Sequence, residues 1–464
     1  MLFTEQRFAL FFIAVLAIYW ALRGNRARKN FLLLCSYAFY AGWDWRLTPL
    51  ILFSTVMDYA LALRITGDQA RKKRWLVISL VANLTLLGFF KYFNFFIESA
   101  VGFSAWLGIP LSMHTLAIVL PVGISFYTFE SLSYTIDVYR GILKPVRNFL
   151  DYAFFIAFFP KLIAGPIMRA KDFLPQLTDG RRWANVNVRA CLTMFLIGYI
   201  KKAVISDHIA QAIDPVFAAP AGVAASTLWL AAALYTLQLY CDFSAYSDMA
   251  TACAGLLGYR LTLNFDAPYL SQSVREFWTR WHISLSTWFR DYLFIPLGGS
   301  RGTPMRTAVN LFTVFVLCGI WHGAAWTLVI FGMIHGLFMS IERFVDVGRM
   351  PRPLRHAYLL LVLVLSLSIF RSTDVSLWVS MLRGMFGLGA ATTTATVSSS
   401  WILPLWWLVP IAFLLIQAVD QRVHLARALA RVPMWRFTAA YGLSVAFVLP
   451  WVAVGYRPFI YFQF

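Results

Sequence analysis

Charged residues are scarce in this 464-residue chain: Asp, Glu, Lys and Arg make up 13% of it, against about 25% in an average soluble domain. Hydrophobic residues reach 60% instead. This balance excludes a soluble enzyme and a disordered chain. It predicts an all-α protein that crosses a membrane many times, and at about 20 residues per helix there is room for roughly nine to twelve spans.

Cysteine is also rare. The spacing of the five cysteines offers no disulfide framework and no zinc site, and no metal is expected. The motifs GxSxG, Walker A and HExxH, and GxGxxG at a strand–helix turn, are absent as well, which argues against a serine hydrolase, an ATP-driven pump and a zinc protease. The five cysteines are scattered through apolar segments without a Cys-x-x-Cys pair: Cys35, Cys191, Cys241, Cys253 and Cys318.

The remaining charge is one-sided, with 40 Lys and Arg against 21 Asp and Glu and a net charge of +19. The basic residues stand in short clusters between apolar runs. This pattern fits cytoplasmic loops better than a nucleic-acid surface, so no nucleic-acid partner is expected. The clusters at 23–29 and 71–74 follow the first and third apolar runs and predict that the N-terminus lies outside the cytoplasm.

Apolar runs recur along the whole chain, and one of them, 152–167, is interrupted by two prolines and a lysine. That composition predicts a re-entrant segment buried in protein. No internal repeat is visible, which disfavours an inverted-repeat transporter, and 387–400 reads as a flexible polar loop. The apolar runs from which the spans are drawn are 7–22, 31–43 (short for a span), 47–63, 75–96, 115–136, 190–205, 227–241, 249–263, 307–321, 327–341, 357–370, 401–419 and 437–454.

One basic and aromatic stretch has the spacing of an amphipathic helix. Between Val274 and Tyr292 apolar residues recur at intervals of three and four, as on one face of a helix. His282 falls at the edge of that face. Two interpretations stay open: an interfacial basic helix with an incidental histidine, or a helix inside the protein that presents His282 and its arginines to an anionic ligand.

Histidines in the apolar C-terminal half are the strongest functional candidates. His322 lies between two apolar runs, and ionisable groups at membrane depth are functional candidates. An imidazole that titrates near neutral pH is suited to proton transfer; the alternative is a structural histidine bonded to a neighbouring carbonyl. His335, in Gly332-x-x-His335-Gly336, is more readily explained by close helix packing beside a satisfied histidine.

These stretches are parts of a longer pattern. The strongest part is 275–299, which contains Arg280-Trp281-His282, and a second is Trp321-His322-Gly323. On this pattern the chain resembles the membrane-bound O-acyltransferase (MBOAT) family, in the bacterial branch of alginate O-acetylation membrane proteins. The other matching stretches are 1–3 with 30–43, 120–129, 134–141, 158–167, 240–248 and 458–464.

The resemblance implies a single membrane domain over 1–464, a ring of roughly eleven tilted transmembrane helices with re-entrant and amphipathic interfacial helices. It implies that the protein is an O-acetyltransferase of the bacterial inner membrane. Acetyl-CoA, a co-substrate from the cytoplasm and not a bound cofactor, would supply the acetyl group. A periplasmic SGNH-type or alginate-modifying acetyltransferase would receive it and pass it to an exopolysaccharide, with alginate favoured.

The resemblance also implies the two main site residues. His322 matches the catalytic histidine of the family, and would take a proton from a hydroxyl or carry the acetyl group itself. His282 matches the second active-site position, which is Asn in many eukaryotic relatives, and would polarise the thioester carbonyl. Trp278 and Trp321 are candidates to support the two histidines.

Charged residues receive secondary roles. Arg275, Arg280 and Arg290 are expected to meet the phosphates of acetyl-CoA, because guanidinium groups bind phosphate well. Asp242 and Asp248, near the predicted end of a span, either support the histidines or cap a helix.

Two other classes of protein stay open beside the enzyme. A transporter or acetyl conduit without chemistry would use buried histidines for proton coupling. A scaffold subunit of a polysaccharide modification or export complex would not need His322. The histidine positions and the joint matches favour the enzyme.

Overall fold

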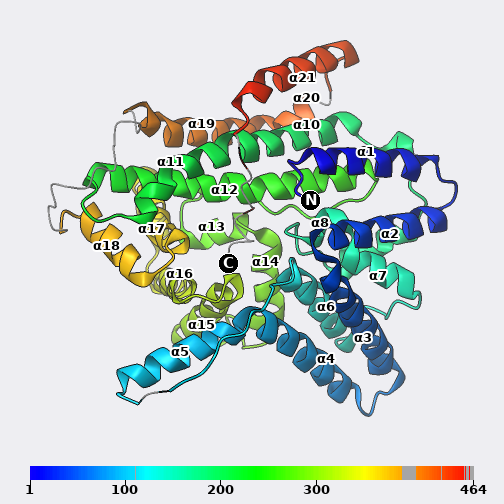
Figure 1. The fold of residues 1–464 in the computed structure, drawn as a ribbon, viewed down its shortest axis with the longest axis horizontal. Coiled ribbons are helices and arrows are strands. Elements are labelled where there is room, and N and C mark those ends of the chain that lie inside the picture. The colour runs from blue at the N-terminus through cyan, green and yellow to red at the C-terminus, as the bar shows by residue number, and fades with distance from the viewer. Residues whose placement is uncertain (110, 389–403, 430, 454, 456–458, 460–464) are drawn as a thin grey trace. The chain divides into compact units, whose positions relative to one another are not determined.

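The computed structural model describes residues 1–109, 111–388, 404–429, 431–453, 455 and 459. Every regular element in these residues is a helix (Figure 1), which confirms the all-α prediction. The predicted polar loop, apart from residues 387 and 388, and the closing stretch 458–464, apart from Phe459, lie outside the described residues.

Five helical segments of the described chain are long and apolar enough to cross a membrane. The protein is therefore a helical membrane protein, as the composition predicts; the number of roughly eleven spans and their arrangement in a ring stay predictions. The five segments are Asn25–Gly67, Lys72–Trp106, Pro304–His322, Trp326–Phe344 and Arg352–Arg371.

The chain divides into two compact units. The first comprises Met1–Val188 and Ala250–Thr262, and the second comprises Arg189–Met249 and Leu263–Phe464. The single domain expected over 1–464 stays a prediction.

The first unit contains helices α1 (Gln6–Ala21), α2 (Asn25–Asp44), α3 (Thr48–Gly67), α4 (Lys72–Leu87), α5 (Phe93–Trp106), α6 (Ile124–Tyr139), α7 (Phe149–Ala157), α8 (Phe159–Leu162) and α9 (Ala170–Phe173). Helices α3, α4 and α6 pack against one another, and α2 packs against α7. Between α3 and α4 the buried carboxylate of Asp58 accepts hydrogen bonds from Ser79 (2.6 Å) and Asn83 (2.9 Å). The Asp58 carboxylate inside this apolar cluster is thus paired, as burial requires.

The proline-containing segment 152–167 differs from an ordinary span. It is divided between α7 and α8, and Pro160 lies in the first turn of α8, where its missing N–H is tolerated. Lys161 of α8 forms an ion pair with Glu130 of α6, and both side chains are buried. The segment is therefore enclosed by protein at its charged residue, while its re-entrant path through a membrane stays a prediction.

The span predicted over 115–136 is helical only from residue 124 onward. Pro121 disfavours helix in the residue before it, and Gly123 takes a left-handed conformation with φ of 76°. A Cβ at Gly123 would lie 2.5 Å from the carbonyl oxygen of Leu162, so only glycine allows this approach.

The second unit contains helices α10 (Val188–Tyr199), α11 (Asp207–Ala218), α12 (Ala225–Leu256), α13 (Val274–Arg280), α14 (Ile283–Phe289), α15 (Pro304–His322), α16 (Trp326–Phe344), α17 (Arg352–Arg371), α18 (Val375–Met385), α19 (Leu408–Val423), α20 (Leu425–Leu429) and α21 (Met434–Val448); α10 begins one residue before the unit and α12 ends in the first unit. Helix α15 packs along α16, and α16 packs on α17 (Figure 1). A Cβ on Gly332 of α16 would meet the Phe315 carbonyl of α15. The hairpin of α15 and α16 therefore packs backbone against backbone.

Two spans predicted separately, 227–241 and 249–263, share one continuous helix, α12. The predicted break rests on Asp242 and Asp248. Each carboxylate forms an ion pair, Asp242 with Lys202 (2.7 Å) and Asp248 with Lys201 (2.7 Å), so the helix continues through them. Both lie inside α12, and the prediction that they cap a helix is wrong.

Candidate active site

The candidate site lies entirely within the second unit, and its central feature is a break in the amphipathic stretch. Helix α13 ends at Arg280 and α14 begins at Ile283, with His282 between them in a left-handed conformation (φ 43°, ψ 54°). Among residues with a side chain, Asn, Asp and His tolerate this conformation best. The single helix predicted over 274–292 is wrong here, because the backbone turns at His282 instead of continuing its helical path.

The imidazole of His282 is completely buried among aromatic rings. Its centre lies 4.6 Å from that of Phe243, nearly perpendicular to it, and 6.0 Å from that of Trp321. Phe459 packs against Phe243 in turn, with ring centres 5.8 Å apart. Burial lowers the pKa of His282, which lies outside the candidate spans, well below its ordinary value, and the nearby His322 lowers it further. His282 is therefore neutral at physiological pH.

His322 is the last residue of α15 and is 3% exposed. Its Nδ1 lies 2.7 Å from the carbonyl oxygen of Cys318. Because a carbonyl can only accept, Nδ1 carries the hydrogen and Nε2 carries the lone pair. The carbonyl bond expected of a structural histidine is thus present, and it directs the basic nitrogen to Nε2. The ring packs against Trp321 (5.1 Å) and Phe370 (5.4 Å).

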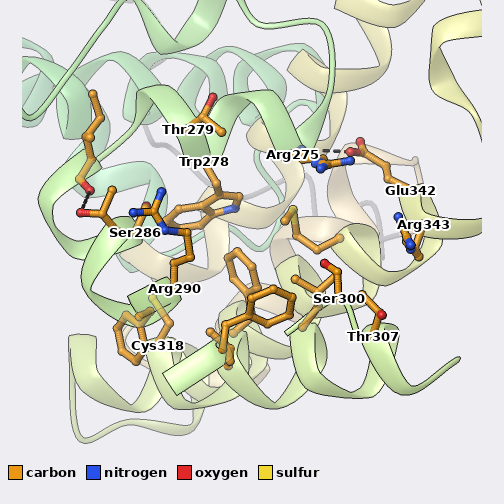
Figure 2. Close-up of a pocket in the computed structure, with 18 residues that line it drawn as sticks. Arg275, Trp278, Thr279, Ser286, Arg290, Ser300, Thr307, Cys318, Glu342 and Arg343 are labelled. Carbon is orange, nitrogen blue, oxygen red and sulfur yellow. Dashed lines mark hydrogen bonds between the residues drawn. The ribbon is translucent and has the colours of Figure 1, made fainter. Parts of the chain in front are cut away.

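A pocket of about 320 Å³ lies between α13 and α14 on one side and α15 and α16 on the other (Figure 2). Neither histidine lines it, but Ile283, the residue after His282, does. Its wall is largely apolar and includes Cys318, whose Sγ lies 3.9 Å from Nδ1 of His322. Figure 2 shows Arg275, Glu342 and Arg343 at one end, Cys318 toward the other, and the indole of Trp278 between them. The pocket therefore has two arginines and the Glu342 carboxylate at one end, and Arg290 toward the other, where its wall reaches the helical turn that precedes His322.

Arginines line the pocket, though not quite the predicted set. Arg275 and Arg290 are in its wall. Arg280 is not, and its guanidinium pairs instead with Glu276 (2.9 Å). Arg343 is in the wall but is not among the predicted residues. The sequence signal that could have found it is its place at the end of the apolar run 327–341.

Trp278 links the pocket wall to a second histidine. Its indole N–H donates to Nδ1 of His335 (3.2 Å), and Nε2 of His335 bonds the hydroxyl of Ser366 (3.0 Å). Both ring nitrogens of His335 have partners, in agreement with the interpretation of a satisfied histidine. Phe331 packs against His335 (4.6 Å) and against His322 (5.9 Å). Trp278, Trp321, His282 and His322 thus gather in one cluster, whereas Asp242 and Asp248 are engaged with lysines.

The second unit of this helical membrane protein thus holds the buried histidines His282 and His322 and a pocket lined by three arginines. The model of the membrane-bound O-acyltransferase family matches residues 143–382, which include all the residues of the predicted site. The chain belongs to this family and is an O-acyltransferase.

Three relatives align with most of this chain. It is 43% identical to a probable alginate O-acetylase of Pseudomonas aeruginosa, over 84% of this chain and 75% of the relative. A probable alginate O-acetylase of Azotobacter vinelandii is 42% identical over 84% and 79% of the two chains. A peptidoglycan O-acetyltransferase of Helicobacter pylori is 35% identical over 78% and 75%. The names of these relatives therefore include O-acetylation of two different polymers.

Proposed function

We propose that this chain is an O-acetyltransferase of the bacterial inner membrane, with its N-terminus outside the cytoplasm. It takes an acetyl group from cytoplasmic acetyl-CoA and passes it across the membrane to a periplasmic partner, an SGNH-type or alginate-modifying acetyltransferase. The final acceptor is an exopolysaccharide. Alginate is favoured because relatives at 43% and 42% identity carry that polymer in their names.

The observation that carries the proposal is the arginine-lined pocket whose wall reaches Cys318, one helical turn before His322. The phosphates of acetyl-CoA are anionic, and guanidinium groups bind phosphate through paired hydrogen bonds. In the proposal Arg275 and Arg343 hold the nucleotide end of acetyl-CoA. The apolar wall then receives the thioester arm and brings the acetyl group toward His322.

The proposed transfer needs one base and one hydrogen-bond donor. Nε2 of His322 takes the proton from the acceptor hydroxyl, whose oxygen attacks the thioester carbonyl. The C–S bond then breaks, and His322 returns the proton to the departing CoA thiolate. His282, neutral and buried, donates an N–H to the carbonyl oxygen while that oxygen carries negative charge. A positioned general base accelerates such a step by about 10²–10⁴-fold.

The decisive experiment measures alkali-labile acetate on the cell-envelope and secreted polysaccharides. A deletion strain is complemented with the wild type, with His322→Ala or with His208→Ala at matched membrane levels. His208 is the matched control because its Nδ1 bonds the carbonyl of Val204 (2.7 Å), as His322 bonds that of Cys318. We expect acetate to be restored by the wild type and by His208→Ala, and not by His322→Ala.

The other outcomes separate the alternatives. Equal restoration by His322→Ala would remove the catalytic role of His322 and favour a conduit or a scaffold. A conduit also predicts that no CoA is released from acetyl-CoA. Purified protein is therefore incubated with acetyl-CoA and acceptor, and free CoA thiol is measured. Unchanged acetate in the deletion strain would refute the proposed reaction for these polymers.

A further inference from the structure

The backbone of residues 264–266 forms hydrogen bonds on both sides of the left-handed turn at His282. The N–H of Ile283 donates to the carbonyl of Asn264 (2.9 Å), and the N–H of Asp266 donates to the carbonyl of Arg280 (2.9 Å). One bond lies on each side of His282. Together they satisfy the N–H of Ile283 and the carbonyl of Arg280, two groups that a continuous helix would bond within itself.

The buried side chain of Asn264 adds further hydrogen bonds next to this turn. Its Oδ1 accepts from the hydroxyl (2.9 Å) and the main-chain N–H (3.3 Å) of Ser284, and its Nδ2 donates to Ser247 (3.2 Å). Ser284 lies in the first turn of α14, while Ser247 lies on α12 one turn after Phe243, the ring that packs on His282. Asn264 is 3% exposed. A single buried amide therefore joins the start of α14 to the helix that supports the His282 ring.

The hydrogen bonds around His282 work against an alternative structure, one continuous helix over 274–292. The left-handed conformation costs a residue with a Cβ about 1–2 kcal/mol, and such strain persists only where the surroundings enforce it. The apolar spacing of 274–292 favours one continuous helix. In that helix the side chain of residue 282 would leave the backbone in another direction. The contacts made by Asn264 select the broken form.

We infer that Asn264 is a positioning residue that holds the break at His282 and thereby keeps the His282 imidazole against Phe243 and beside Trp321. The inference rests on the proposed role of His282 in acetyl transfer. Asparagine is suited to the task because its amide accepts and donates at once, which neither a carboxylate nor an aliphatic side chain does.

The first test compares Asn264→Ala with Asn310→Ala in the purified full-length protein. Asn310 is also buried, and its amide donates to the carbonyl of Gly299 (3.1 Å), so the control removes a similar bond. We expect kcat to fall about a hundredfold in Asn264→Ala, as misplacement of a reacting group does, with the KM for acetyl-CoA little changed. Adding His282→Ala to this variant should cost nothing more, because both changes remove one interaction.

A conservative variant tests the hydrogen-bonding role itself. In Asn264→Asp, a protonated carboxyl group supplies one acceptor and one donor, as the amide does, whereas the ionised group supplies no donor. We therefore expect the kcat of Asn264→Asp, relative to wild type at the same pH, to rise as the pH falls. A ratio that does not change with pH would overturn the hydrogen-bonding role of Asn264.

A measurement that does not depend on acetyl transfer completes the test. Diethyl pyrocarbonate modifies accessible imidazoles, and its rate at His282 is followed by mass spectrometry. We expect faster modification of His282 in Asn264→Ala than in wild type or Asn310→Ala; an unchanged rate would overturn the inference. If wild type transfers no acetyl yet the rate rises in Asn264→Ala, the proposed function fails while the positioning of His282 stands.

Discussion

The two imidazoles of the site are held by different means. His322 is held through its ring, by the bond from Nδ1 to the carbonyl of Cys318. His282 is held through its backbone, in a left-handed turn. Asparagine also tolerates that turn. This is a physical reason why Asn could stand at this position in many eukaryotic relatives, as the family resemblance implies. His282→Asn should therefore preserve the fold better than His282→Ala.

Acid should destabilise the wild-type protein more than the His282→Asn variant. His282 has a pKa far below 6.5 when folded, whereas unfolding returns it to about that value, so the unfolded state binds a proton that the folded state does not. Between about pH 7.5 and about pH 5.5 this difference lowers the free energy of unfolding by up to about 1.4 kcal/mol. Thermal unfolding in one detergent at both pH values measures it; equal losses in the two proteins would contradict the prediction.

Arg343 should contribute to binding of acetyl-CoA rather than to the transfer step. It lines the pocket at the same end as Arg275, and a hydrogen bond to a charged group is worth about 1.5–3 kcal/mol. We therefore expect Arg343→Ala to raise the KM for acetyl-CoA about tenfold or more, since about 1.4 kcal/mol is tenfold, with little change in kcat. Steady-state kinetics measure this. Arg349→Ala, at an exposed arginine paired with Asp346, is the control, and an equal effect there would refute a specific role.

The hairpin of α15 and α16 carries His322, and its close packing depends on glycine. Gly319 and Gly332 stand where the two backbones meet. Neither position has space for a methyl group, so a change there forces the helices apart. The position of His322 relative to α16 is thus set by residues that take no part in the proposed chemistry.

Gly332→Ala should destabilise the protein by at least about 1–3 kcal/mol, the usual cost of overpacking. Gly442→Ala is the control, because nothing lies within 4 Å of a Cβ at that position and alanine favours a helix by up to about 1 kcal/mol over glycine. Unfolding in denaturant measures both variants. A Gly332→Ala protein as stable as Gly442→Ala would show that the hairpin can open without cost.

At the level of the elements, helices were predicted more accurately than their ends. Hydropathy identified the apolar runs of α12, but it divided them at Asp242 and Asp248. The lysines that pair with these carboxylates lie about forty residues earlier in the chain. A local window cannot include such partners, so it reads a compensated charge as the end of a helix. The same limitation applies to 274–292. The helical spacing of its apolar residues predicts one helix, whereas Asn264, which contributes to the break, lies outside that stretch.

Across the whole molecule, the basic clusters between apolar runs determine the predicted orientation in the membrane. We expect Trp45→Cys to react with a membrane-impermeant maleimide in intact cells. Gln69→Cys, next to the basic cluster 71–74, should react only after the membrane is permeabilised. Both positions are exposed, and the five native cysteines are buried or half-buried, so background labelling is low. The reverse labelling pattern would refute an N-terminus outside the cytoplasm.

A helical membrane protein and the candidacy of His322 were accessible from the chain alone, because hydropathy and the presence of His322 between apolar runs are local properties. The acyltransferase class and the roles of the two histidines came from the resemblance to the MBOAT family. The arrangement of the site was accessible from neither. The pairing of Trp278 with His335, the exclusion of Arg280 from the pocket, the inclusion of Arg343 and the turn at His282 all depend on contacts between residues distant in the chain. Such contacts exist only once helices pack, so the tertiary structure alone decided which of the candidate residues meet.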